Sequence, residues 1–146
     1  WAPKELMQAG ELVEGEVAGL AARHARKAQV ARIASALARM QDEVGVGIVP
    51  RAGDEDFHNA VAGACGNEVL SDTVRGYWHA RRGPISERLG DHFENPLSWQ
   101  RALAEHQAVL DAIRVRDADS ARAAMRDHLR KAYTRYSASW RRANHP

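Results

Sequence analysis

The chain has 146 residues, of which 45% are hydrophobic and 27% charged. This length is typical of one domain with a single core. The 21 basic and 19 acidic residues leave a net charge of +2, and no stripe of basic side chains alternates with aromatic ones. A nucleic-acid-binding surface within this sequence is therefore not expected.

The single cysteine, Cys65, cannot form an intrachain disulfide, which fits a reducing cytoplasm. No apolar run approaches the roughly 18 residues of a membrane span, and no segment resembles a signal peptide. We therefore expect a cytoplasmic protein without membrane contact. Because the chain begins at Trp1 rather than Met, we also expect a further N-terminal region before it.

Apolar residues recur at helical spacing along nearly the whole chain. The pattern predicts a first helix over residues 4–25, a second over 27–43 and a short third over 54–65. Glycines and a closing proline in the segment 45–50 indicate a connector. The pattern also predicts a fourth helix, which ends at Gly83 and Pro84. One face of this helix carries Leu70, Val74, Trp78 and Arg81.

The second half of the chain predicts a long loop over residues 83–97 and two more helices. Ser98 is expected to cap the fifth helix, and Asp117 or Asp119 the sixth, which ends near Arg142. The predicted fold is all-α: an antiparallel bundle of six or seven helices that encloses a ligand pocket containing a metal.

Asp54 and His58 are four residues apart on the predicted third helix. This spacing puts their side chains on one face, about 5–6 Å apart at Cβ, close enough to share an ion. Asp56 points nearly the opposite way. Glu55, three residues before His58, is the only local rival to Asp54 as a ligand.

Two further histidines replace apolar residues in the stripes of later helices. His106 continues the stripe of Leu103 and Leu110, and His128 lies beside Leu129 in the last helix. A lone histidine in such a position is more often a satisfied core residue. Three inward histidines and a carboxylate instead predict a metal site, with the ligands Asp54, His58, His106 and His128.

This ligand set suits one divalent ion, with Zn first and Ni, Co, Mn or Fe as alternatives. A closed tetrahedron around Zn would be a structural site, whereas an octahedral ion would keep two open positions for a small carboxylate. We favour ligand binding, because Asn67 and Arg81 on the fourth helix are candidate effector-binding residues. Arg81 can form paired hydrogen bonds to a carboxylate, although a surface ion pair is its alternative role.

Several segments occur in a specific order and at specific separations. They are Asp54-x-x-Phe57-His58, Ala64-Cys65-Gly66-Asn67, Glu105-His106-x-x-Val109-Leu110-x-Ala112-Ile113, then Asp117, then Ala121-x-x-x-Met125-x-x-His128-Leu129. Together they resemble the FCD domain, the effector-binding C-terminal domain of FadR-type members of the GntR family of transcription regulators. Many members carry an arginine in the first helix where this chain has Gly10, four residues before Glu14.

The resemblance implies an FCD-like domain over residues 1–146 that follows an N-terminal winged-helix DNA-binding domain. It also implies that Asp54, His58, His106 and His128 hold a divalent metal, and that the protein is a homodimer. We therefore expect a ligand-sensing and dimerisation domain that binds a small organic acid and modulates DNA binding.

Two alternatives to this function stay open. A metal with open positions could activate water in a hydrolase-like enzyme. We do not expect an enzyme, because no Asp or Glu general base lies on an inward face beside the ligands; Glu105 is turned about 100° from His106 around the helix. The second alternative is a helical interaction module with a purely structural metal.

Overall fold

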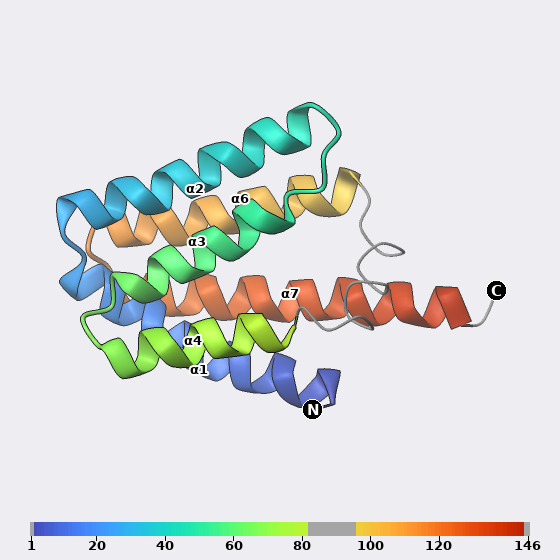
Figure 1. Ribbon diagram of the computed structural model, residues 1–146, viewed down its shortest axis with the longest axis horizontal. Helices are drawn as coiled ribbons and strands as arrows, with labels where there is room; N and C mark the ends of the chain where they lie inside the picture. The colour runs from blue at the N-terminus through green and yellow to red at the C-terminus, as the bar shows by residue number, and fades with distance from the viewer. Residues whose placement is uncertain (1, 82–95, 145–146) are drawn as a thin grey trace.

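A computed structural model describes residues 2–81 and 96–144, with side chains up to residue 138. This part of the chain forms six α-helices, which confirms the all-α fold (Figure 1). They are α1 (Pro3–His24), α2 (Lys27–Gly45), α3 (Arg51–Gly63), α4 (Glu68–Ala80), α6 (Pro96–Arg114) and α7 (Ala118–Asn144). None of these described helices is long and apolar enough to cross a membrane.

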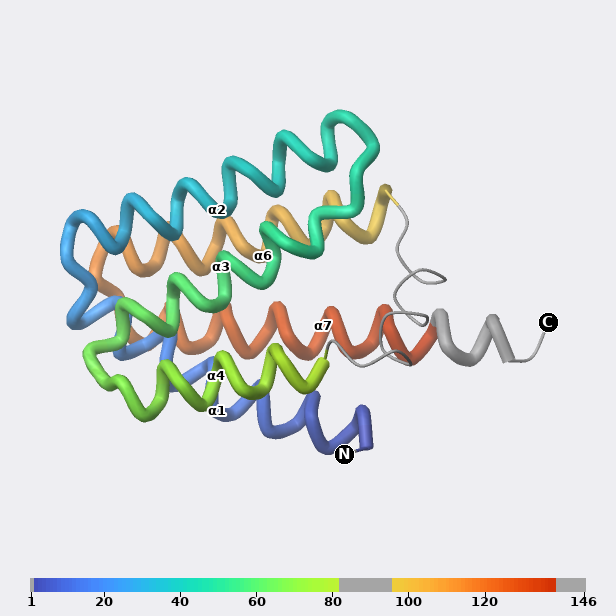
Figure 2. Tube along the Cα trace, viewed as in Figure 1, coloured from blue at the N-terminus to red at the C-terminus, as the bar shows by residue number. Residues whose placement is uncertain are grey.

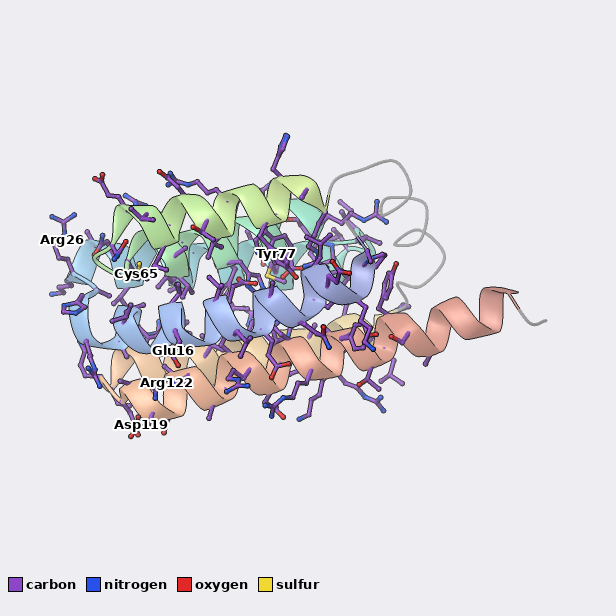
Figure 3. The ribbon with its side chains drawn as sticks, turned by 90° about the horizontal axis from the view of Figure 1, so that it is seen from below. Glu16, Arg26, Cys65, Tyr77, Asp119 and Arg122 are labelled. Carbon is purple, nitrogen blue, oxygen red and sulfur yellow. The ribbon has the colours of Figure 1, made fainter. Side chains whose placement is uncertain are left out.

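The helices run along one long axis, and consecutive helices point in opposite directions (Figure 2). Seen from below, α1 lies between α4 and α7 (Figure 3). On the other side, α2 packs against both α3 and α6. Every helix contributes fully buried apolar side chains to one core, for example Val17, Ile33, Phe57, Val74, Leu110 and Met125.

Helix α3 begins at Arg51, earlier than the sequence pattern predicts, with Pro50 at its N-cap. Gly53 permits this extra turn, because a Cβ at that position would lie 2.7 Å from Cγ of Met40 in α2. Asp54 therefore belongs to the first turn of α3, where its amide donates to the carbonyl of Pro50. A carboxylate is favourable there, because the N-terminal end of a helix carries partial positive charge.

Helix α6 begins at Pro96, so the prediction that Ser98 caps it is wrong. Proline suits a first helical position, where its missing N–H has no intrahelical partner in any case. Asp117 caps α7 by accepting hydrogen bonds from the amide and hydroxyl of Ser120. The predicted stop at Gly83 and most of the predicted loop over 83–97 lie outside the described residues.

Gly10 marks a close approach between α1 and α4. A Cβ at this position would collide with the phenol ring of Tyr77, which Figure 3 labels beside α1. The ring therefore occupies the space that a longer side chain at position 10 would need. Burial raises the pKa of the Tyr77 hydroxyl to about 12, so it stays protonated.

Candidate metal centre

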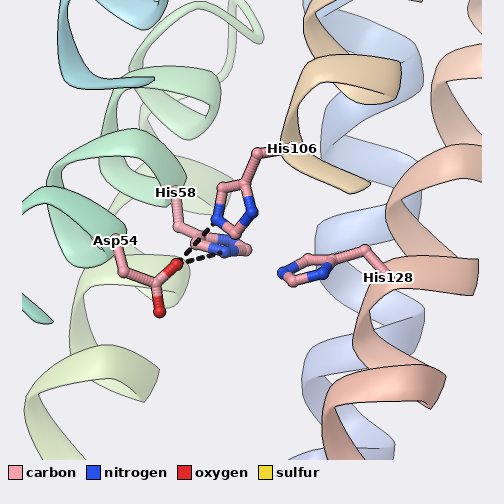
Figure 4. Close-up of side chains that lie close together, drawn as sticks. All are labelled: Asp54, His58, His106 and His128. Carbon is pink, nitrogen blue, oxygen red and sulfur yellow. Dashed lines mark hydrogen bonds and ion pairs between the residues drawn. The ribbon is translucent and has the colours of Figure 1, made fainter. Parts of the chain in front are cut away.

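Three helices bring the four predicted ligands together (Figure 4). Asp54 and His58 come from α3, His106 from α6 and His128 from α7. One donor atom from each side chain lies within 4.8 Å of all the others. Metal–ligand bonds of 2.0–2.2 Å put donor atoms on opposite sides of an ion about 4.2 Å apart. The cluster therefore has the size of a metal site, and its carboxylate and three imidazoles are suitable ligands for a divalent metal ion.

Asp54 is the shared acceptor of the cluster. Its Oδ1 lies 2.7 Å from Nε2 of His106 and 3.3 Å from Nε2 of His58. Burial alone would raise the pKa of Asp54, but the hydrogen bond from His106 and the close contact with His58 outweigh it and hold the pKa well below 3.8. Asp54 is therefore ionised, which is the form that binds a metal.

Acceptor groups behind His58 and His106 orient both rings. Nδ1 of His58 lies 2.7 Å from Oε1 of Glu14, and Nδ1 of His106 lies 2.6 Å from the carbonyl oxygen of Ala102. Since both partners accept, each Nδ1 carries the hydrogen and each Nε2 points to the centre. Nε2 of His58 is buried without a hydrogen-bond partner in the described part of the chain. An ion would satisfy it.

Sequence reasoning set Glu105 aside because it faces away from His106. Glu105 does face away from His106, but its side chain points towards α7, where its Oε1 lies 2.7 Å from Nδ1 of His128. Arg135 binds both oxygens of Glu105 at 2.8 Å. Burial acts to raise the pKa of Glu105, but the bonds from Arg135 and His128 lower it to about 2. Burial and the neighbouring His106 lower the pKa of His128 to about 4, so its ring is neutral and fit to bind a metal.

Glu14 is the second functional residue that sequence reasoning missed. Its Oε1 accepts from Nδ1 of His58 and from Nε1 of Trp78, 3.3 Å away, and the residue is 2% exposed. Burial tends to lower the pKa of His58, but the charge of Glu14 and the contact with the Asp54 carboxylate raise it to about 9. The sequence does contain an indication that Glu14 is buried, because it lies three residues before Val17 on the inward face of α1.

A cavity of about 690 Å³ lies beside the cluster, and all four candidate ligands line it. Positions on a bound ion that the protein leaves open would therefore face this cavity. Its wall also contains several arginines: Arg39, Arg51, Arg81 and Arg135. The guanidinium carbon of Arg81 lies 4.3 Å from the ring centroid of Trp78, which holds this cation against the wall.

Residues 5–131 of the chain match the FCD domain. The chain belongs to the FCD domain family of GntR-type transcription regulators. The Uxu operon transcriptional regulator of Escherichia coli K12 is 32% identical over 130 residues, which are 87% of this chain and 51% of that protein. HTH-type transcriptional regulator LutR of Bacillus subtilis is 32% identical over 127 residues, which are 86% of this chain and 58% of that protein.

A solved structure of E. coli McbR/YncC matches this FCD domain with a TM-score of 0.82 at 16% identity. The match covers 94% of this chain and 65% of that chain, and at this identity it supports the fold alone. The chain spans about half the length of the curated relatives it matches. These relatives are transcription regulators by description, in agreement with the prediction that the chain is not an enzyme.

The structure brings one of the two predicted effector-binding residues to the cavity of the FCD domain. Arg81, at the C-cap of α4, lines it. Asn67 does not line it, because it lies at the other end of α4. There its exposed side chain caps the helix by accepting a hydrogen bond from the amide of Leu70.

Proposed function

We propose that this FCD domain senses a small organic acid at a metal ion held by Asp54, His58, His106 and His128. Zn is the first choice of ion, with Ni, Co, Mn or Fe as alternatives. The observation that carries the proposal is that the four candidate ligands and four arginines line one cavity. A purely structural site needs no such cavity.

The charges of the cavity favour a carboxylate ligand. A divalent ion would bind one carboxylate oxygen at a position left open by the protein, and Arg81 would bind another part of the same molecule. Stacking on Trp78 engages the flat face of the Arg81 guanidinium, whereas carboxylates bind at its edge. The volume of about 690 Å³ falls within the range of small-molecule pockets. A hydroxy acid or a dicarboxylate could contact both cations.

Acid binding would modulate DNA binding by another part of the protein. The relatives are regulators roughly twice as long as this chain, and the chain's own net charge of +2 offers little attraction to phosphate. We further propose that the full protein is a homodimer. One relative, 37% identical over 81 residues, is named as a putative L-lactate dehydrogenase operon regulatory protein. L-lactate is therefore among the acids to test.

Calorimetric titration of the metal-loaded and metal-stripped domain with L-lactate, malate, citrate and benzoate tests the proposal. At least one acid should bind with metal and bind far more weakly without it. Arg81→Ala should weaken that binding by about 1.5–3 kcal/mol, the value of a charge-assisted hydrogen bond. Arg75→Ala is the matched control, since Arg75 is on the same helix, pairs with Asp72 at the surface and is outside the cavity.

Equal affinity with and without metal would contradict the proposed mechanism. Stoichiometric metal in a domain that binds none of these acids would favour the structural-metal alternative.

A further inference from the structure

We infer that Glu14 is a positioning residue for the metal site: it orients His58 and supplies the second of two negative charges that a divalent ion would balance. The inference rests on the proposed metal site. It concerns a residue of α1, a helix that contributes none of the four ligands.

The contacts of Glu14 are unusual for a buried acid. One oxygen, Oε1, lies 2.7 Å from Nδ1 of His58 and 3.3 Å from Nε1 of Trp78. The other, Oε2, is buried with no hydrogen-bond partner within the described residues. The rings of His58 and Trp78 also pack together, with centroids 4.5 Å apart. Glu14 therefore fixes His58 against α4 and leaves its Nε2 directed at the centre of the cluster.

Each of the three histidines has a different kind of acceptor behind it. His106 bonds to a neutral carbonyl oxygen. His128 bonds to Glu105, whose charge is countered by the bidentate guanidinium of Arg135. Glu14 is more deeply buried than Glu105, and its ion pair is with the imidazole of His58. Of the three acceptors, Glu14 thus adds a negative charge close to the cluster, and among the described residues its side chain pairs with His58 and Trp78 and with no guanidinium.

This charge has a direct consequence for metal binding. Glu14 and Asp54 lie on opposite sides of the His58 ring, at 2.7 Å from Nδ1 and 3.3 Å from Nε2. Burying carboxylates is costly unless a positive charge accompanies them. A divalent ion bound to neutral histidines would match the two carboxylates, Asp54 as a ligand and Glu14 through the ring. Removing the charge of Glu14 should therefore weaken binding even when the shape of the side chain is kept.

Two substitutions separate orientation from charge. Glu14→Gln keeps an oxygen that can accept from Nδ1 of His58, while Glu14→Leu removes both the acceptor and the charge. Glu11→Gln is the matched control. Glu11 lies on the same helix, and it pairs with Arg126 and Arg130 instead of a metal ligand.

The measurements are Zn²⁺ affinity by chelator competition, the visible spectrum of the Co²⁺ form, and the free energy of unfolding without metal. We expect Glu14→Gln to bind Zn²⁺ about 10-fold more weakly with a Co²⁺ spectrum like that of the wild type. Glu14→Leu should bind about 100-fold more weakly with a changed spectrum. Glu11→Gln should match the wild type in both.

Wild-type Zn²⁺ affinity in Glu14→Gln would overturn the role of charge, and wild-type affinity in both Glu14 variants would overturn the inference as a whole. In the latter case, a loss confined to the metal-free unfolding free energy would mean that Glu14 is merely structural. If Glu14→Leu does not fold, the near-isosteric Gln variant carries the test. No acid is added, so failure of effector binding leaves this result unaffected, whereas a wild-type domain without Zn²⁺ affinity refutes both proposals.

Discussion

Replacing Asp54 by asparagine should remove most of the stabilisation that a metal gives this domain. Asp54 provides the only carboxylate of the four-residue cluster, with Oδ1 at 2.7 Å and 3.3 Å from two histidine Nε2 atoms. Asparagine keeps the shape of the side chain and loses its charge. We expect the affinity for a divalent ion to fall by at least the roughly 100-fold that loss of a single outer partner of a metal ligand can cost.

The size of the effect follows from mass action. At a free metal concentration 100 times the wild-type Kd, binding raises the free energy of unfolding by about 2.7 kcal/mol. If the substitution weakens binding about 100-fold, the same concentration equals the Kd of the variant. The gain then falls to RT ln 2, about 0.4 kcal/mol. The expected difference between the two proteins is therefore about 2.3 kcal/mol.

Urea unfolding with and without Zn²⁺ measures this gain. Each protein is compared with itself, so that effects of the substitution on the metal-free fold cancel. Asp56→Asn is the control, because Asp56 is on the same helix, is 56% exposed and pairs with Arg39 at 2.7 Å. It should gain as much from metal as the wild type. A full gain in Asp54→Asn, or an equal loss in both variants, would refute the ligand assignment.

Raising the pH should destabilise the metal-free domain between about 6.5 and 9. The pKa of His58 is raised from about 6.5 in the unfolded chain to about 9 in the fold. The stability that protonated His58 contributes is therefore complete below pH 6.5 and is lost as the pH rises through 9. A free energy of unfolding that stays constant between pH 6.5 and 9 would contradict this prediction. Gly10→Ala should cost about 1–3 kcal/mol by overpacking the ring beside it. Gly76→Ala is its control: with no atom within 4 Å of the new Cβ, it should be neutral or stabilising in the same urea assay. Equal changes in the free energy of unfolding for the two variants would argue against the close packing of Gly10 on Tyr77. Arg135→Ala should raise the pKa of Glu105 from about 2 and weaken Zn²⁺ binding about 10-fold in chelator competition. Unchanged affinity would mean that Glu105 does not support the site.

Helical periodicity was sufficient to predict the four-residue cluster. Asp54 and His58 share a face whatever the exact start of α3, and His106 and His128 each interrupt an apolar stripe that must face the core. The same helical spacing of apolar residues also predicts that the elements are helices. The predicted starts of α3 and α6 were wrong by two or three residues. Helix α3 begins directly after Pro50 and α6 begins at Pro96, and both prolines were interpreted as part of a connector or loop.

The groups behind the ligands could not be predicted in the same way. Glu14 is 44 residues from His58, and Glu105 is 23 residues from His128, so these pairs form only when separate helices dock. No spacing rule within one helix connects them. Asn67 is the opposite case: it stands immediately before α4, and the local rule for helix caps would have assigned it a structural role without any tertiary information.

The order of the helices also governs when the site can exist during protein synthesis. His58 and His128 are 70 residues apart, which at ordinary translation rates corresponds to roughly 4–14 s. Of the described helices, α1 is synthesised before the others, yet it packs against α7, where Glu11 pairs with Arg126 and Arg130. The side of α1 that packs against α7 therefore stays uncovered until that helix is made. An ion could therefore bind the full cluster only after α7 has docked. A chain that stops before α7 would leave the site without His128 and α1 without its contacts to α7.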